Sequence, residues 1–326
     1  MSTTTGTTAT GTTAALEDEP RPATVAAASG KAAGIGRSSP LNLLFVLPYI
    51  LLLLVLLALP VGLGVWLSFQ DYDMLGGFNA YVGLENYTNL FKDRMFRQAV
   101  LNTALFVLMT VPVFVGLGLF LALMLNSRRV FSTAARSIFF GTSVLSVTVV
   151  TLVWRLVYLP GNGLLADVLG AVGLPAPEIV ASPTLALPGV AVVTLWWIIG
   201  LPMTLFLAGL QQIPPELYEA AALDSAGRVR TLLFVTLPQI RRTALLVALI
   251  EIILQFQIFG QVLLITGGGP DNRSRPVVQF IYESGFRDWQ LGFASAASQV
   301  LFALMLLAAC AQLWAARRPR GQGAES

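Results

Sequence analysis

Six long stretches of this 326-residue sequence are apolar and nearly without charge. A membrane-spanning helix needs ~20 mostly apolar residues, because lipid offers no partners for exposed backbone groups. We therefore predict an all-α, polytopic membrane bundle of six transmembrane helices. The fifth stretch contains one charged residue, Glu251, and the stretches are residues 41–69, 100–126, 137–154, 184–210, 243–266 and 291–316.

The composition supports this prediction. Apolar residues make up 56% of the sequence and charged residues 11%, and the mean hydropathy is +0.74. These values lie outside the range of soluble globular domains, so core helices of a large soluble protein are the weaker alternative.

Basic residues indicate the orientation. With a cytoplasmic N-terminus, the segments on that side hold 13 Lys and Arg residues and the opposite segments hold seven. Cytoplasmic loops are enriched in Lys and Arg, so we predict that both ends of the chain are cytoplasmic. The net charge of +3 then reflects orientation rather than binding of nucleic acid.

The two ends of the sequence differ from its centre. Residues 1–40 are rich in Thr, Ala, Gly and Ser, and such a segment buries too little apolar surface to order itself. We predict a disordered cytoplasmic tail there, a membrane domain over residues 41–316 and a short cytoplasmic tail over residues 317–326. The first segment lacks a basic start followed by an apolar core, which argues against a cleaved signal peptide.

Residue types that often carry catalysis are scarce. The sequence has no His, and its single cysteine, Cys310, lies in the last apolar stretch. This argues against a zinc site, Ser-His-Asp chemistry and a disulfide framework. No GxxxxGK[ST] phosphate loop occurs either. We expect no catalytic residue, bound metal or cofactor in this chain, and no enzymatic activity of its own.

Two connections on the predicted outer side should contain short helices. Residues 164–173 form an apolar run after a turn at residues 160–163. Before the second stretch, apolar residues recur at helical spacing, which predicts an amphipathic surface helix containing Leu84, Tyr87, Leu90 and Phe91.

The connection over residues 211–241 is polar and helical, unlike the stretches on either side. Pro214-Pro215 suits a helix start, and Glu216 and Glu219 follow in the first turns, where the helix dipole favours carboxylates. Alanines at 220–222 favour the helix and allow another protein's backbone to approach closely.

Residues 225–227 predict a break in this helical segment. A second helix should follow and end at Leu237-Pro238, where we expect the chain to turn into the fifth span. An ordinary pair of interfacial helices would explain this pattern equally well, because Glu-Ala-Ala is a common string.

The spacing of the whole loop resembles the "EAA" loop of ATP-binding-cassette (ABC) importer permeases, at Glu219, Ala220, Ala221, Asp224, Ala226, Leu237 and Pro238. In that family the loop docks on an ATPase subunit. The resemblance implies that Glu219, Ala220 and Ala221 line the helix that enters a cleft on the ATPase, with Asp224, Gly227, Leu237 and Pro238 completing the coupling site. Ser225 takes the place of the usual glycine, which leaves the form of the turn open.

Two further segments carry the same resemblance. Residues 81–103 are similar to the GLxNYxxLFxDxxFxxAxxNT segment of carbohydrate-importer permeases. Residues 266–270, TGGGP, with Gly292-Phe293-Ala294-Ser295-Ala296, resemble a signature typical of the first of two permeases in maltose-, multiple-sugar- and glycerol-phosphate-type importers.

This resemblance implies a type I permease fold in the inner (cytoplasmic) membrane. It also implies four kinds of partner: a second homologous permease, a dimer of ATPase subunits that bind ATP and Mg, an extracytoplasmic solute-binding protein and the lipid bilayer.

Polar residues inside spans mark helix contacts or a substrate path. In the fifth stretch, Glu251 and Gln255 share one helical stripe, and Gln257 and Gln261 another. One stripe could meet a neighbouring helix, and the other could face a water-filled path where sugar hydroxyls need partners. Aromatic residues could stack on sugars or anchor the chain at the membrane interface; these are Trp154, Trp196 and Trp197.

We therefore interpret the sequence as the permease subunit of an ABC importer for a sugar, oligosaccharide or polyol derivative. A self-sufficient secondary transporter is the alternative, and it predicts inverted repeats and a titrating residue at mid-span. No repeat is seen, and Glu251 is the one candidate for titration. A scaffold without transport would leave the spacing of the loop unexplained.

Overall fold

The computed structural model describes residues 40–73, 75–76, 79–127 and 130–317. The chain divides into two compact units, Met1–Val55 and Leu56–Ser326. In the first unit the described residues form α1 (Pro40–Leu53) and the start of the π-helical segment η1 (Leu54–Ala58). The predicted terminal tails lie outside the described residues, apart from Pro40 and Arg317 at their edges.

The second unit is built from helices joined by short loops, with one small hairpin of antiparallel strands, β1 (Gln70–Tyr72) and β2 (Asn79–Tyr81). Its helices are α2 (Leu59–Leu67), α3 (Glu85–Lys92), α4 (Arg94–Leu125), α5 (Val130–Thr142), α6 (Val147–Val157), α7 (Leu164–Ala171), α8 (Ala186–Ile198), α9 (Gly200–Leu210), α10 (Pro215–Leu223), α11 (Arg228–Thr231), the π-helical η2 (Leu232–Thr236), α12 (Leu237–Phe256), α13 (Gly260–Ile265), α14 (Val277–Phe286) and α15 (Leu291–Arg317).

Four of the described helices are long and apolar enough to cross a membrane, and the number reaches six when each of two bent pairs counts as one span. The four are Val46–Leu67, Arg94–Leu125, Arg228–Phe256 and Leu291–Ala316. The bent pairs are α5 with α6 and α8 with α9. The predicted helical membrane bundle is therefore confirmed.

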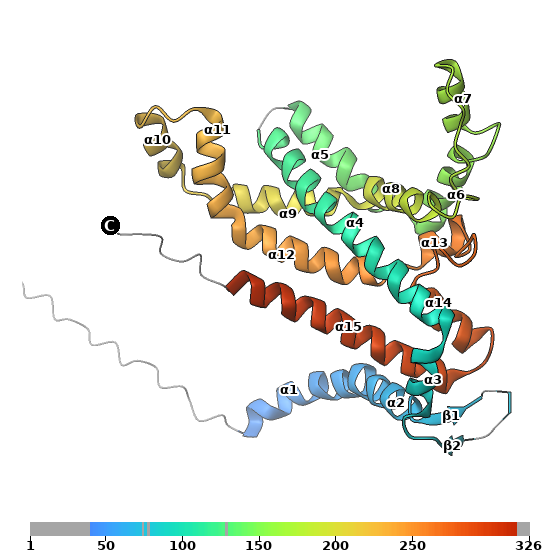
Figure 1. Cartoon of the computed structure of the whole chain (residues 1–326). Helices are drawn as coiled ribbons and strands as arrows, with labels where there is room; N and C mark the ends of the chain where they lie inside the picture. The colour runs from blue at the N-terminus through green and yellow to red at the C-terminus, as the bar shows by residue number, and fades with distance from the viewer. Residues whose placement is uncertain (1–39, 74, 77–78, 128–129, 318–326) are drawn as a thin grey trace, which may run out of the picture. The chain divides into compact units, whose positions relative to one another are not determined.

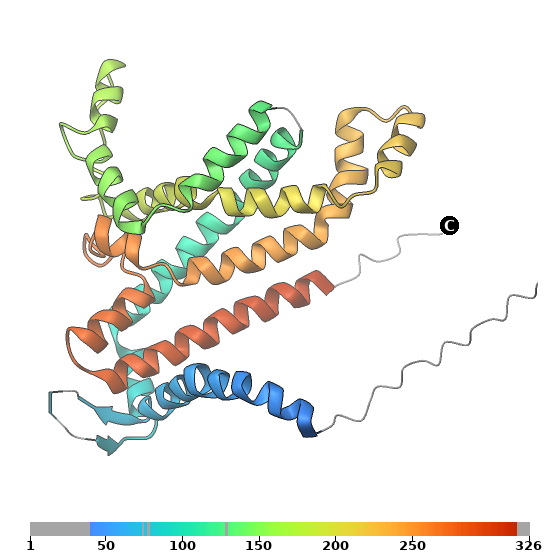
Figure 2. The ribbon, with the colours of Figure 1, turned by 180° about the vertical axis from the view of Figure 1, so that it is seen from behind.

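The centre of the second unit is formed by α4, α9 and α12, which pack on one another (Figure 1). Gly118 of α4 permits a close approach, because a Cβ there would lie 3.0 Å from the Cβ of Pro202 on α9. Small residues allow such contacts between membrane helices. Apolar side chains then fill the space around them, including the fully buried Met203 and Phe206. In the view from behind, α15 runs along α12 (Figure 2), and the two helices are in contact.

The third and fourth spans are broken, which the uniformly apolar sequence did not indicate. α5 and α6 meet at 97°, and α8 and α9 at 48°. The two breaks are bonded to each other: the Thr142 hydroxyl donates to the Trp197 carbonyl at 2.9 Å, and the Trp197 indole N–H donates to the Leu145 carbonyl at 3.1 Å. Backbone groups exposed by the break in one span thus find partners in the other.

The fifth span also differs from the expected stretch, residues 243–266. One continuous helix reaches from Arg228 to Phe256. It stops there, and residues 257–259 separate it from the short α13. The two stripes of polar residues were inferred for one regular helix that passes through residue 257. The structure has a break there, so Gln257 and Gln261 do not lie on the same helix as Glu251 and Gln255.

We call the end of the unit that contains β1, β2, α3 and α14 the hairpin end (Figure 1). The amphipathic helix expected before the second span is α3, whose Leu90 is fully buried while Phe91 is exposed. Its Asn86 amide donates to the carbonyls of Ser68 and Gln70, at 3.0 and 2.9 Å. The helix expected at residues 164–173 is α7, Leu164–Ala171.

Candidate coupling site

The loop over residues 211–241, which we call the coupling loop, begins with a helix whose start follows from its sequence. Pro215 occupies the first turn of α10, where its missing N–H costs nothing, and Glu216 complements the helix dipole. The Tyr218 hydroxyl lies 3.3 Å from that of Thr236 on η2. Tyr218 and Leu237 also pack on the apolar cluster around Leu210, which anchors α10 to the bundle.

The end of α10 resolves the question raised by Ser225. The Ala226 N–H donates to the Ala221 carbonyl at 2.9 Å, and the Ser225 N–H to the Ala222 carbonyl at 3.0 Å. These two bonds form a Schellman motif, which places one residue in the left-handed region. Ser225 is that residue, with φ of 54°. The serine therefore adopts the conformation that a glycine would adopt more easily.

The second helix of the loop begins at Gly227 and does not end at Leu237-Pro238. The Thr231 hydroxyl donates back to the Gly227 carbonyl, four residues earlier, at 3.2 Å. α11 then passes through the π-helical η2 into α12, with Pro238 in the first turn of α12. The expected turn at Leu237-Pro238 is thus replaced by a continuous helix, because the wider π-helical turn accommodates a residue that lacks an N–H.

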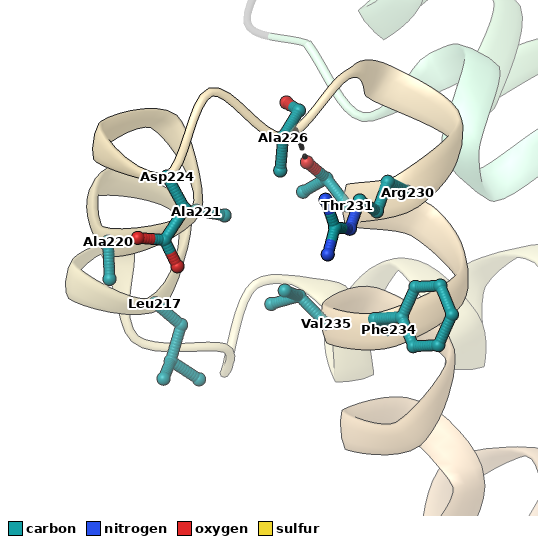
Figure 3. A pocket seen from close by; sticks show the side chains of 9 residues that line it. All are labelled: Leu217, Ala220, Ala221, Asp224, Ala226, Arg230, Thr231, Phe234 and Val235. Carbon is teal, nitrogen blue, oxygen red and sulfur yellow. Dashed lines mark hydrogen bonds between the residues drawn. The ribbon is translucent and has the colours of Figure 1, made fainter.

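A groove of about 430 Å³ lies between α10 and the facing α11 and η2 (Figure 3). Asp224 lies on the α10 side and Arg230 on the opposite side, so each wall carries one charge. The wall of α10 is otherwise made of small or aliphatic side chains. The lining residues are Leu217, Ala220, Ala221, Asp224, Ala226, Arg230, Thr231, Phe234 and Val235.

The predicted coupling residues lie on one loop, but they occupy different environments in the structure. Ala220, Ala221 and Asp224 line the groove, and Ala221 is 8% exposed. Glu219 points to neither the groove lining nor the core and is exposed. Gly227 begins α11, Leu237 packs on the bundle, and Pro238 is exposed in the first turn of α12. The loop therefore exposes Glu219 and Ala220 on an anchored helix pair, whereas Ala221 is buried in the groove wall.

The polar residues of the fifth span separate into two environments. Glu251 is fully buried and Gln255 is 2% exposed, and the Gln255 amide donates to the Glu251 carboxylate at 2.9 Å. Gln257 is exposed at the break, and Gln261 is half-buried on α13. The burial of the first pair favours the packing alternative for Glu251 and Gln255.

The three tryptophans considered for sugar stacking take structural positions. Trp154 contacts Trp196 edge to face, with ring centroids 5.7 Å apart. Trp197 bonds the breaks of the third and fourth spans, as described above.

A polar network at the hairpin end was not recognised in the sequence. The Asn102 amide donates to the carbonyls of Asn272 and Arg275, at 2.7 and 2.8 Å. Arg275 forms an ion pair with Glu283 at 3.0 Å, and the Gln279 amide donates to Glu283 at 3.0 Å. The only hint in the sequence was a carboxylate, Glu283, one turn from a glutamine in an apolar helix.

The same network requires the glycines of the TGGGP segment. Gly268 has φ of 89°, and a Cβ there would lie 2.8 Å from the Gln279 amide nitrogen. The Ser274 hydroxyl closes the loop by donating to the Gly269 carbonyl at 2.7 Å. The Gln279 amide also donates to the Gly267 carbonyl at 2.9 Å, so the segment is a tight turn bonded to α14.

The fold is that of a polytopic membrane protein, a helical bundle with a polar helix pair between its fourth and fifth spans. Residues 87–321 match the family described as "Binding-protein-dependent transport system inner membrane component". The chain belongs to this family, and the resemblance to ABC-importer permeases is confirmed.

Curated relatives cover most of the chain. The probable ABC transporter permease protein YurN of Bacillus subtilis is 32% identical over 83% of this chain and 94% of its own length. The sulfoquinovosyl glycerol transport system permease protein SmoG of Agrobacterium fabrum is 30% identical over 82% of this chain and 87% of its own. The diacetylchitobiose uptake system permease protein NgcF of Streptomyces coelicolor is 31% identical over 76% of this chain and 74% of its own.

A solved structure shares the fold. A chain of a bacterial ABC transporter involved in the import of the acidic polysaccharide alginate matches with a TM-score of 0.76 and 22% identity, over 86% of this chain and 96% of that chain. The type I permease fold expected from the sequence is therefore confirmed.

Proposed function

We propose that this chain is one of two permease subunits of an ABC importer that takes up a carbohydrate. The coupling loop carries the proposal: its anchored helix pair presents Glu219, Ala220 and a groove on a protein that has few exposed polar surfaces in its spans. The curated names of the relatives support a carbohydrate, since sulfoquinovosyl glycerol and diacetylchitobiose are sugar derivatives.

The proposed assembly has three kinds of partner besides lipid. A second homologous permease completes the path, two ATPase subunits bind and hydrolyse ATP with Mg, and an extracytoplasmic binding protein delivers the solute. A solved alginate ABC transporter in complex with a pentasaccharide-bound periplasmic protein is consistent with such an assembly. This chain then contributes no catalytic residue.

In the proposed mechanism, closure of the ATPase dimer moves the helix of Glu219, Ala220 and Ala221. Because α11, η2 and α12 are continuous, displacement of the loop is carried directly into the fifth span. Gln257 and Gln261 would face the solute path near the end of that helix, and Glu251 with Gln255 would hold the helix in the bundle.

The docking role is tested by Glu219→Lys, which reverses an exposed charge and leaves helix propensity nearly unchanged. We expect normal accumulation of the permease, poor co-purification of the ATPase and solute uptake lowered by about tenfold or more.

The matched control is Glu85→Lys, which reverses an exposed charge in the first turn of α3 at the hairpin end. Uptake with this variant should stay near normal. Near-normal uptake with both variants would remove the docking role from the coupling loop.

The orientation is tested with single cysteines in a Cys310→Ala background and an impermeant thiol reagent applied to intact cells. We expect cysteines at Ser132, Ser225 and Gln322 to be shielded and one at Asn272 to be labelled; Gln322 lies outside the described residues. Labelling at Ser225 from outside would reverse the proposed topology.

A further inference from the structure

Three aromatic side chains form a continuous series from the break in the fifth span to the surface of α14. The rings of Phe259 and Tyr282 have centroids 5.2 Å apart, and those of Tyr282 and Phe286 are stacked with centroids 5.8 Å apart. Tyr282 is 39% exposed and Phe286 is 61% exposed. We call these three residues the aromatic ladder.

One end of the ladder lies where the helix of the fifth span is interrupted. Phe259 precedes α13 directly, and Gln257 is exposed two residues earlier. Irregular backbone at membrane depth is tolerated where protein buries it or where it lines a water-filled cavity. An exposed amide beside the break favours the second condition, because lipid would leave that amide without partners.

The ladder is not the main contact of α14 with the bundle. The opposite face of α14 is buried, and its Phe280, 4% exposed, contacts the rings of Phe96 and Phe293. Tyr282 and Phe286 are four residues apart, so they share the other face of the helix. Phe286, and the part of Tyr282 that Phe259 does not cover, therefore remain on the exposed surface of α14.

Polar side chains border both ends of the ladder. The exposed Gln257 comes two residues before Phe259 in the chain, and Arg287 follows Phe286 with its side chain 67% exposed and its guanidinium 3.6 Å from Glu283. Ring faces bordered by an amide and a guanidinium match a pyranose, which has an apolar C–H face and hydroxyl groups around its rim. A purely lipid-facing surface would not require these donors.

We propose that the aromatic ladder is a binding surface for a pyranose ring of the transported carbohydrate. The sugar would occupy this surface as it passes from the hairpin end to Gln257. The rings of the ladder contact one another, so the sugar would lie on the exposed faces of Tyr282 and Phe286. This inference rests on the carbohydrate import proposed above.

The first test measures access from water in the complete transporter, in a Cys310→Ala background. Cysteines replacing Tyr282 and Phe286 should react with the impermeant reagent 2-sulfonatoethyl methanethiosulfonate. The matched controls are Phe120→Cys on α4 and Phe302→Cys on α15, both at exposed phenylalanines of long apolar helices. The controls should react about tenfold more slowly, because a charged reagent is excluded from lipid. Equally slow reaction at the ladder would overturn the proposal and indicate that lipid or the second permease covers it.

The second test measures protection by sugar. Maltose, cellobiose and raffinose are each added at saturating concentration during labelling, and at least one should slow the reaction at Tyr282→Cys and Phe286→Cys by about threefold or more. Labelling that none of these sugars slows would overturn the ladder as a sugar surface.

The two proposals fail in different ways. If the importer function is wrong, deletion of the permease leaves uptake of all three sugars unchanged. If only the proposal for the aromatic ladder is wrong, uptake still depends on the permease. In that case Tyr282→Leu transports sugar with the same half-saturating sugar concentration as the unaltered protein. With the ladder as proposed, that concentration should rise by roughly three- to tenfold, while Tyr282→Phe, which keeps the ring, should stay near the original value.

Discussion

The coupling loop and the hairpin end of the second unit are fixed in opposite ways. In the coupling loop, α10 is held by apolar contacts and by the hydroxyl pair of Tyr218 and Thr236. At the hairpin end, an ion pair and the two buried amides of Asn102 and Gln279 bind the 266–276 segment to two helices. A loop that binds a partner needs an exposed surface, whereas a turn at the end of a bundle can form all its bonds with residues of the same chain.

This difference has a physical consequence for mutation. Buried charged and amide groups are costly when one partner is removed, because the other stays desolvated. A substitution on an exposed helix surface costs little stability, but it can weaken recognition of a partner. We therefore expect the hairpin end to fail by unfolding and the coupling loop to fail by uncoupling.

The largest effect is expected for Glu283→Leu. This change leaves Arg275 with a largely buried guanidinium and no carboxylate at 3.0 Å, which should cost about 3–5 kcal/mol of stability. Thermal unfolding of the purified protein in detergent measures it. Asp288→Leu, which removes an exposed carboxylate in the same region, is the control. Equal midpoints for both variants would show that the network does not hold this end.

A smaller effect is expected for Ala221→Leu. Ala221 is 8% exposed and lines the groove between α10 and η2, so a larger side chain should push the two walls apart at a cost of about 1–3 kcal/mol. Co-purification of the ATPase should fall as well. Ala222→Leu, at an exposed position on the same helix, should leave both properties near normal. Loss of ATPase with Ala222→Leu and not with Ala221→Leu would contradict the importance of the groove wall.

The smallest effect is expected for Ser225→Gly, which should increase stability, whereas the preceding variants should lower it. Ser225 has φ of 54°, and a residue with a Cβ is less stable there by roughly 1 kcal/mol than glycine. The glycine variant should protect the amides of α10 more strongly from hydrogen exchange. Ser225→Val should protect them less. A loss of protection with glycine would show that the serine hydroxyl, not the backbone, stabilises the turn.

The sequence predicted the elements that depend on local composition. Long apolar runs predicted the spans, and the proline, alanine and glycine positions predicted a broken helix pair at residues 214–236. The sequence also located the break at residues 225–227, although it left the conformation of Ser225 open. These features are local because helix starts, ends and crossings are decided by neighbours in the chain.

Features that depend on distant partners were not predictable. Asn102 binds carbonyls 170 and 173 residues away, and nothing near Asn102 in the sequence indicates them. The breaks at residues 143–146, 199 and 257–259 fall in stretches that are apolar on both sides, so composition gave no boundary. The continuous helix through Pro238 was missed because a π-helical turn has no sequence signal comparable to a glycine or a cap.

The bonded breaks of the third and fourth spans also bear on how the protein is made. Leu145 precedes its donor, Trp197, by 52 residues, so the third span emerges from the ribosome well before its partner exists. Until then, the carbonyl of Leu145 has no indole to accept from, and an unpaired backbone group is costly in lipid. We therefore expect the bent shape of the third span to become stable only after the fourth span has been synthesised and supplies these bonds.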